Sequence, residues 1–105
     1  MTCDFPAIGH RYLVDFIAFR VQLYFASAES LTYYNVAKDG TIVGSETLAI
    51  KVEPIAERIF LVTWQESDKT TVVHIENYVN NTIVTNITGP DLSFRQFHGA
   101  FVELC

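Results

Sequence analysis

The feature that most constrains the fold of this chain is the regular recurrence of short runs rich in alternating, β-branched and aromatic residues. Turn-forming residues bound each run, a pattern typical of an antiparallel barrel or sandwich. The sequence predicts strands at His10–Phe16, Val21–Ala26, Leu31–Val36, Glu46–Glu53, Arg58–Gln65, Thr70–Tyr78, Thr82–Thr88 and Leu92–Glu103. About eight strands form a closed barrel that either fills with side chains or holds one small ligand. We therefore predict an all-β antiparallel barrel, with residues 1–105 forming one domain.

Turn residues support these boundaries. Lys38-Asp39-Gly40 is a strong hairpin signal between two of the predicted strands. Pro54 is expected to end the fourth strand, because proline cannot donate a hydrogen bond to a sheet. Residues 15–24 are ambiguous, since their apolar positions fit a helical spacing nearly as well as a strand. A short helix there is the alternative prediction.

The composition limits the size of the core and the class of partner. A chain of 105 residues, half of them apolar, is the size of one compact domain. The net charge is −5, and the seven Lys and Arg residues are spread singly along the chain. No basic stripe is therefore available to neutralise phosphates, and we expect no nucleic-acid partner.

The sequence also bears on the cellular compartment. No apolar run approaches the roughly 20 residues that cross a bilayer, and the first ten residues resemble no secretion signal. We expect a cytoplasmic protein without a membrane partner. Cys3 and Cys105 lie near opposite ends of the chain, where a barrel could bring them together. In a reducing compartment two free thiols are the expected state.

The stretch Phe60–Glu66 raises a question about the interior. Alternate residues of a strand share a face, so Val62, Trp64 and Glu66 lie on the same side as Phe60. Glu66 then has two interpretations. It is either a solvated residue at the rim of the barrel or an acid beside an apolar pocket.

The predicted strand Thr70–Tyr78 can face either way. If Val72 points inward, so do His74, Glu76 and Tyr78, and the barrel contains a polar, titratable pocket. If Val73 and Ile75 point inward instead, the same polar residues form a solvent face, which is a common pattern in antiparallel sheets. The sequence leaves both orientations open.

Other candidate site residues come from the first two strands. Tyr12 and Phe16 form an apolar set with Val14, and Tyr12 or Tyr24 could bring a hydroxyl group to a pocket. Metal binding is not expected, because the three histidines lie on different predicted strands without the spacing of a ligand pair. Nucleophile and phosphate-loop motifs are missing from the sequence, and it indicates no cofactor.

Three segments, in order and spacing, resemble the MoaF-like proteins, a group named for molybdenum cofactor biosynthesis protein F. They are VTWQE at 62–66, TVVHIENY at 71–78 and TNITGPD at 85–91, and Gly9, Tyr12, Asp15, Phe16, Phe94 and Gly99 add to the likeness. The resemblance covers nearly the whole chain. It implies a lipocalin-like (calycin-type) β-barrel, in agreement with the strand count, and it assigns no particular activity.

A more distant likeness links the chain to the phenolic acid decarboxylases, which are also lipocalin-like barrels. Trp64 and Glu66 match their Trp-x-Glu strand end, where the glutamate works beside tyrosines and an arginine. The arginine of that pattern has no counterpart here, because the corresponding region reads Gly44-Ser45-Glu46-Thr47-Leu48. A carboxylate substrate would therefore lack its expected charge partner.

Three functions remain open from the sequence. The first is a binding module for a small, partly hydrophobic or aromatic ligand. Its predicted walls are Tyr12, Phe16, Phe60, Val62 and Trp64, and its predicted mouth carries Glu66, His74 and Tyr78. The second is a lyase or isomerase in which Glu66 is the general acid or base and Tyr12, Tyr24 or Tyr78 orients the substrate. The third is a filled barrel that serves as a subunit of a homo-oligomer, for example a homodimer.

Overall fold

The structure is a computed structural model that describes residues 5–104. Its nine strands are β1 (Arg11–Asp15), β2 (Arg20–Ser27), β3 (Ser30–Val36), β4 (Ile42–Ala49), β5 (Lys51–Ala56), β6 (Ile59–Gln65), β7 (Thr71–Asn77), β8 (Thr82–Thr88) and β9 (Phe94–Leu104). These residues contain no helix, so no helix spans a membrane. The prediction about Cys3 and Cys105 lies outside the described residues.

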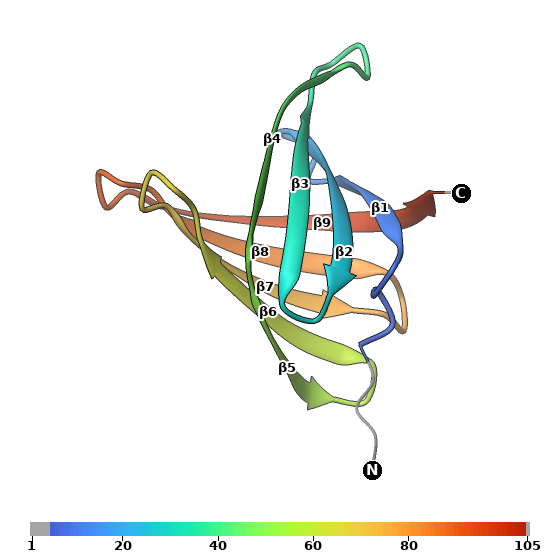
Figure 1. The fold of residues 1–105 in the computed structure, drawn as a ribbon. Coiled ribbons are helices and arrows are strands. Elements are labelled where there is room, and N and C mark those ends of the chain that lie inside the picture. Colours follow the sequence, from blue (N-terminus) through green and yellow to red (C-terminus); the bar gives the residue numbers. More distant parts are fainter. Residues whose placement is uncertain (1–4, 105) are drawn as a thin grey trace.

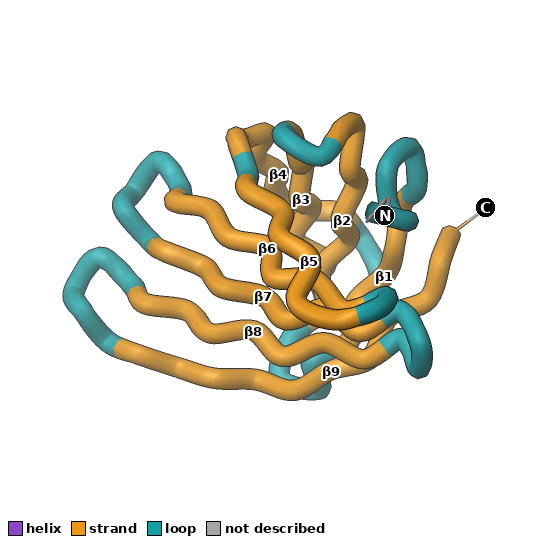
Figure 2. The backbone as a smooth tube through the Cα atoms, turned by 90° about the horizontal axis from the view of Figure 1, so that it is seen from below, coloured by secondary structure: helices purple, strands orange, loops and turns teal. Residues whose placement is uncertain are grey.

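All nine strands belong to one antiparallel sheet in the order β4-β3-β2-β1-β9-β8-β7-β6-β5. Each neighbouring pair is joined by a register of backbone partners. The sheet curls, so that β2, β3 and β4 run across β6 to β9 and the two groups enclose the interior between them (Figures 1 and 2). The predicted all-β, lipocalin-like architecture is confirmed, as a curled half-barrel.

The fourth predicted strand is in fact two strands. The chain bends at the buried Ile50, so β4 pairs with β3 at one edge of the sheet while β5 pairs with β6 at the other. The Ile50 N–H donates to the Glu29 carbonyl oxygen at 3.1 Å, which fixes this crossing point. The run Glu46–Glu53, which reads as one apolar alternation, therefore changes its partner strand halfway along. In this way the chain passes from one edge of the curled sheet to the other.

Two other predictions about elements are wrong. Pro54 does not end a strand but lies inside β5, and this is tolerated because β5 is an edge strand with a neighbour on one side only. The alternative helix at 15–24 does not form. The chain enters β2 at Arg20, and within this strand Val21, Leu23 and Phe25 alternate inward and are buried.

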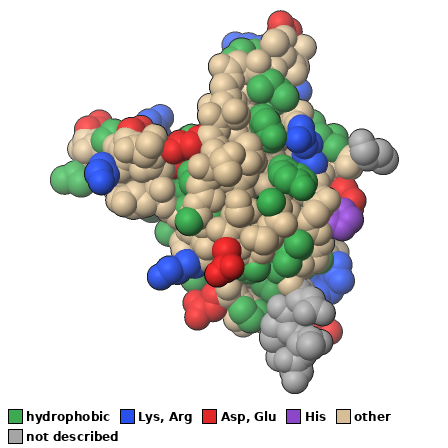
Figure 3. All heavy atoms as spheres, in the orientation of Figure 1, with side chains coloured by type: hydrophobic (Ala, Val, Ile, Leu, Met, Phe, Trp, Pro, Cys, Tyr) green, Lys and Arg blue, Asp and Glu red, His purple; other side chains and the backbone are tan. Residues whose placement is uncertain are grey.

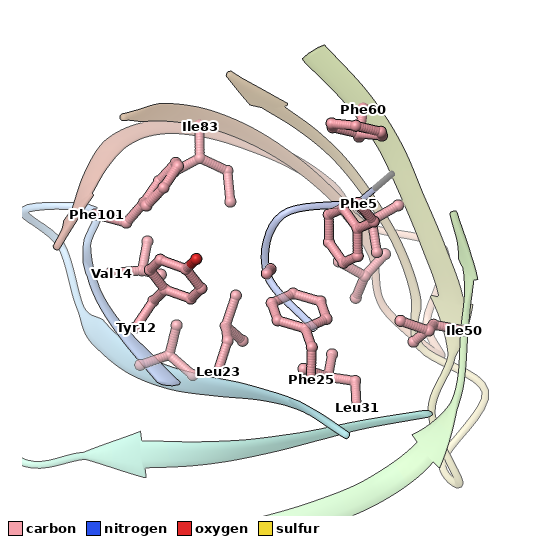
Figure 4. Packing of buried hydrophobic residues seen from close by; sticks show 14 of the residues in the cluster. Phe5, Tyr12, Val14, Leu23, Phe25, Leu31, Ile50, Phe60, Ile83 and Phe101 are labelled. Atoms are coloured by element: carbon pink, nitrogen blue, oxygen red, sulfur yellow. The ribbon is translucent and has the colours of Figure 1, made fainter. Parts of the chain in front are cut away.

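An aromatic cluster fills one end of the interior. Phe5, which precedes β1, packs edge-on against Phe25 and Phe60 with ring centroids 5.0 and 5.2 Å apart, and Tyr12 packs against Phe101 at 5.4 Å. Figure 4 shows these rings meeting inside the barrel. Edge-to-face contacts of this kind stabilise a core beyond the area that they bury. This end of the barrel is therefore packed.

The orientation of β7 is settled by burial. Val72, His74 and Glu76 are buried, whereas Val73 and Ile75 are 37% and 38% exposed. Of the two orientations that the sequence allows, the one that places the polar residues inside is therefore correct. The outward positions carry apolar side chains, which is the reverse of the usual antiparallel pattern.

Candidate functional site

A cavity of about 260 Å³ lies at the end of the barrel opposite the aromatic cluster. The strand β7 shows this division, because Thr70, Val72 and His74 line the cavity while Tyr78, beyond the other end of β7, joins the aromatic rings. The cavity is lined by Phe16, Phe19, Val21, Leu23, Tyr33, Asn35, Trp64, Glu66, Thr70, Val72, His74, Thr85 and Ile87. The lining is thus mostly apolar, with a few polar groups that converge on the same space, as in known ligand sites.

Trp64 and Glu66 point into this cavity together. The indole Nε1–H of Trp64 donates a hydrogen bond to Glu66 Oε2 at 3.1 Å. Burial is the main cause that raises the pKa of Glu66 above its ordinary value, and the negative charges of Asp68 and Glu46 act in the same direction. The bond from Trp64 acts against this shift, since it stabilises the carboxylate. Glu66 is therefore an acid beside an apolar pocket.

A second carboxylate holds the loop beside Glu66. Tyr33, on β3, donates its hydroxyl hydrogen to Glu46 Oε1 at 2.9 Å, and the backbone N–H of Ser67 donates to Glu46 Oε2 at 3.1 Å. Burial and the bond to Glu46 raise the pKa of Tyr33, so its hydroxyl stays protonated. The β6–β7 turn is thereby tied to β4 across the rim of the cavity.

Two buried polar residues of β7 and a third just beyond its end form a hydrogen-bonded chain. His74 Nδ1 lies 2.9 Å from Glu76 Oε2, and the Tyr78 hydroxyl donates to Glu76 Oε1 at 2.7 Å. Glu76 is only 1% exposed. Burial, followed by the charge of Glu76, raises the pKa of Tyr78, which therefore remains a hydrogen-bond donor. Both carboxylate oxygens of Glu76 thus have partners, and the His74 ring is held in place at the cavity wall.

Thr85 provides a polar group with no partner. Its Oγ1 atom is buried and makes no hydrogen bond within the part of the chain that the structure describes. Thr85 lies directly across the β7–β8 ladder from His74, and both line the cavity. A buried hydroxyl group without a partner is costly, so its presence at a cavity wall indicates a group that a bound molecule can satisfy.

The structure brings together some of the predicted site residues and separates others. Phe16, Trp64, Glu66 and His74 line the cavity. Tyr12, Phe60, Val62 and Tyr78 are buried in the interior without lining it. Tyr24 lies on the outer face, because it alternates with the inward Leu23 and Phe25, and the Arg11 guanidinium lies 5.7 Å from its ring centroid.

Several lining residues were not among the predicted site residues. Tyr33 and Thr85 are the polar ones with direct consequences for the site. Thr85 shares a strand face with Ile83 and Ile87 by period two, and this pattern was available as a signal. Phe19 has no such signal, because it lies in the turn between β1 and β2.

The lining of the cavity has an acidic side chain and no strongly basic one. It contains Glu66 and His74 but neither lysine nor arginine. Within residues 5–104 no three His, Cys, Asp or Glu side chains lie together as they would around a metal ion. The arrangement suits an uncharged or cationic molecule better than an anion.

Comparison with known proteins places the chain in a family. A crystal structure of a protein from Burkholderia vietnamiensis, described as a "putative beta-lactamase", has a TM-score of 0.85 and 22% sequence identity, and the match covers 94% of this chain and 96% of that chain. At this identity the likeness shows a shared fold alone. A comparison with curated proteins found no match. The family described as MoaF-like matches residues 8–102, and this chain therefore belongs to the MoaF-like family.

Proposed function

We propose that this protein binds a small, partly hydrophobic or aromatic molecule in its barrel cavity. The observation that carries the proposal is the cavity itself, about 260 Å³ of space with aromatic walls beside the unpartnered Thr85 hydroxyl. Pockets for drug-sized ligands begin at roughly 300 Å³. The expected ligand is therefore small, with one ring or a short chain.

The charge of the ligand follows from the residues that face it. An anionic ligand would find no lysine or arginine in the lining, and it would meet Glu66. Acidic and basic side chains are interspersed on the face shown in Figure 3, so that face offers no broad basic surface to attract an anion. We infer that the ligand is neutral or carries an amine.

Trp64, the only tryptophan of the chain, allows a direct test. Its intrinsic fluorescence should change and saturate on titration with benzyl alcohol and with benzylamine, and benzoate should bind more weakly. These three probes share one ring and differ in charge. A Trp64 signal that none of them alters, together with no binding detected by calorimetry, would contradict the proposal.

A matched pair of variants controls this experiment. Val72→Phe fills the cavity from β7 and should abolish the fluorescence response. Val73→Phe adds the same side chain at the neighbouring outward position and should leave binding intact. If both variants bind the probes as the unmodified protein does, the ligand lies elsewhere on the molecule.

An enzymatic role for Glu66 is a second candidate. The observation that favours it is the raised pKa of a carboxyl group held by an indole at a cavity wall. A lyase or decarboxylase acting on a carboxylate has less support, because the lining lacks the arginine that would hold such a substrate. Turnover that is unchanged in Glu66→Gln would remove Glu66 from this role.

The third candidate is a ligand-free subunit of a homo-oligomer, such as a homodimer. The unfilled cavity counts against a purely structural interior, because protein cores pack with few voids of this size. Sedimentation measurements over a range of protein concentrations would determine the oligomeric state. The oligomeric state does not test ligand binding, which the fluorescence titration decides.

A further inference from the structure

We propose that His74 is a general base oriented by Glu76. In this role it removes a proton from a weakly acidic C–H group of a carbonyl compound bound in the cavity. The inference rests on the proposed function, because it needs a ligand in the cavity. It differs from the role considered for Glu66 in the residue that takes the proton.

The hydrogen bonds of the β7 chain define the free atom of His74. Glu76 Oε1 accepts from the Tyr78 hydroxyl, and Glu76 Oε2 lies 2.9 Å from His74 Nδ1. Two donors therefore serve both oxygens of one buried carboxylate, which places the proton of a neutral His74 ring on Nδ1. The Nε2 lone pair is left as the acceptor. The same arrangement orients the histidine in acid–base dyads of known enzymes.

The surroundings of His74 favour proton transfer. Its ring packs against the Trp64 indole, with centroids 4.7 Å apart and planes at 73°, and Phe16 lies 6.4 Å away. The charged or titratable groups nearby are Glu76 and Tyr78, which follow it along the chain, Glu66 just after β6, and Tyr33 from β3. An apolar wall limits solvation of the base, so little solvent has to be displaced before reaction.

Thr85 gives the site a hydrogen-bond donor beside the base. It is the cross-strand neighbour of His74 and is 1% exposed, and its Oγ1 atom has no partner among the described residues. Buried polar groups are seldom left unpaired in a network that serves only stability. Two unused polar groups, His74 Nε2 and Thr85 Oγ1, therefore belong to adjacent residues in the wall of one cavity.

The proposed step needs no cofactor or co-reactant. The ligand C–H bond breaks, the proton moves to His74 Nε2, and the electron pair passes into the adjacent carbonyl group to give an enolate. The Thr85 hydroxyl, or Glu66 in its protonated form, donates a hydrogen bond to the enolate oxygen. Return of the proton from Nε2 to another carbon of the ligand completes an isomerisation. The substrate class is a small carbonyl compound with an acidic C–H group.

A chemical probe tests the base without knowledge of the natural substrate. The probe is 5-nitrobenzisoxazole, a flat aromatic carbon acid. Removal of its ring proton by a base breaks the N–O bond and releases a coloured cyanophenolate. The unmodified protein should accelerate this elimination, and His74→Gln should lose about 100-fold of the accelerated rate, the typical contribution of a general base. His98→Gln, at an exposed histidine on β9, is the matched control and should keep the rate.

Two measurements separate the base from a merely structural role. In His74→Ala, added imidazole should enter the vacated space and restore part of the rate. Nitrogen-15 NMR of the unmodified protein should show neutral His74 with its proton on Nδ1. Glu76→Gln should shift the ring toward the other tautomer and lower the rate, and Glu76→Asp should partly restore both.

The outcomes distinguish this inference from the proposed function. If the probe binds, as reported by Trp64, but is not turned over faster than in buffer, the base assignment is wrong and the binding proposal stands. If the NMR spectrum of the unmodified protein places the proton of neutral His74 on Nε2, the assignment is also wrong, whether or not the variants fold. Turnover that His74→Gln leaves intact would overturn it as well.

Discussion

At the scale of single residues, the Glu66 carboxyl group links stability to pH. Its folded-state pKa lies above the ordinary value of 4.5, so the folded protein binds this proton more tightly than the unfolded chain does. The resulting stabilisation is fully present below the ordinary pKa and is lost as pH rises through the raised pKa. Glu66→Gln removes this dependence and keeps an acceptor for Trp64.

The measurement is the free energy of unfolding in urea at about pH 4 and about pH 7. These two values lie on either side of most of the titration of Glu66. The free energy of unfolding of Glu66→Gln, minus that of the unmodified protein, should be larger at the higher pH than at the lower pH. Glu57→Gln, at an exposed position before β6, is the control for a lost surface charge. A stability difference between Glu66→Gln and the unmodified protein that does not change with pH would contradict the raised pKa.

Thr85 is the residue at which stability and function should oppose each other. Thr85→Val replaces a buried, unpartnered hydroxyl group with a methyl group of the same shape. Relief of the unpaired group should raise the free energy of unfolding by about 1 kcal/mol. The same change should weaken binding of benzyl alcohol in the Trp64 titration. Loss of stability in Thr85→Val would show that the hydroxyl already has a partner, such as a bound water molecule.

The face on which a residue lies could be read from the sequence where one strand carried enough signal. The parity of Phe60 and Val62 in β6 put Trp64 and Glu66, which directly follows β6, on one face. Tyr24 was a weaker candidate, because it stands next to Leu23 and Phe25, which take the inward face of β2. Parity identifies the face of a residue but not which end of the barrel it occupies. This is why the buried Tyr12 and Phe60 were expected at the cavity.

At the scale of elements, the strand pattern was largely readable from the sequence, and its exceptions have physical causes. β8 has the predicted bounds, Thr82–Thr88, because alternation and turn residues agree there. The division between β4 and β5 at Ile50 was not predictable from alternation, since the chain stays extended while it changes neighbour. The orientation of β7 was undecidable because both of its faces carry residues that can be buried.

Gly99 tests how tightly β9 packs against the end of β1. A Cβ atom at this position would lie 2.6 Å from the Asp15 carbonyl oxygen and 2.7 Å from Phe16 Cδ1. The backbone would have to shift, so Gly99→Ala should lower the free energy of unfolding by about 1–3 kcal/mol. Gly44→Ala on β4, where the nearest atom would be 3.6 Å away, is the matched control and should cost little. Equal stabilities in thermal unfolding would mean that β1 and β9 can separate without cost.

At the scale of the whole molecule, the interior is divided between a packed core and a cavity. Aromatic side chains fill one end of the barrel, where Phe5 enters from the segment before β1, and the other end keeps a cavity. Small domains depend heavily on a well-packed core, so a barrel of this length can keep open space at one end only if the rest is tightly packed. In this chain the cavity therefore lies beside the core, with β6, β7 and β8 contributing to both.

This division predicts different effects for two substitutions of the same kind. Phe25 is 0% exposed in the packed end, so Phe25→Ala should cost about 3–5 kcal/mol of unfolding free energy. Phe19 is partly exposed at the cavity, beside Phe16 and Phe97, so Phe19→Ala should cost clearly less and should change probe binding instead. Urea unfolding and the Trp64 titration on both variants measure the two effects. If Phe19→Ala destabilises the protein as much as Phe25→Ala, the cavity wall is part of the core and the division of the interior is wrong.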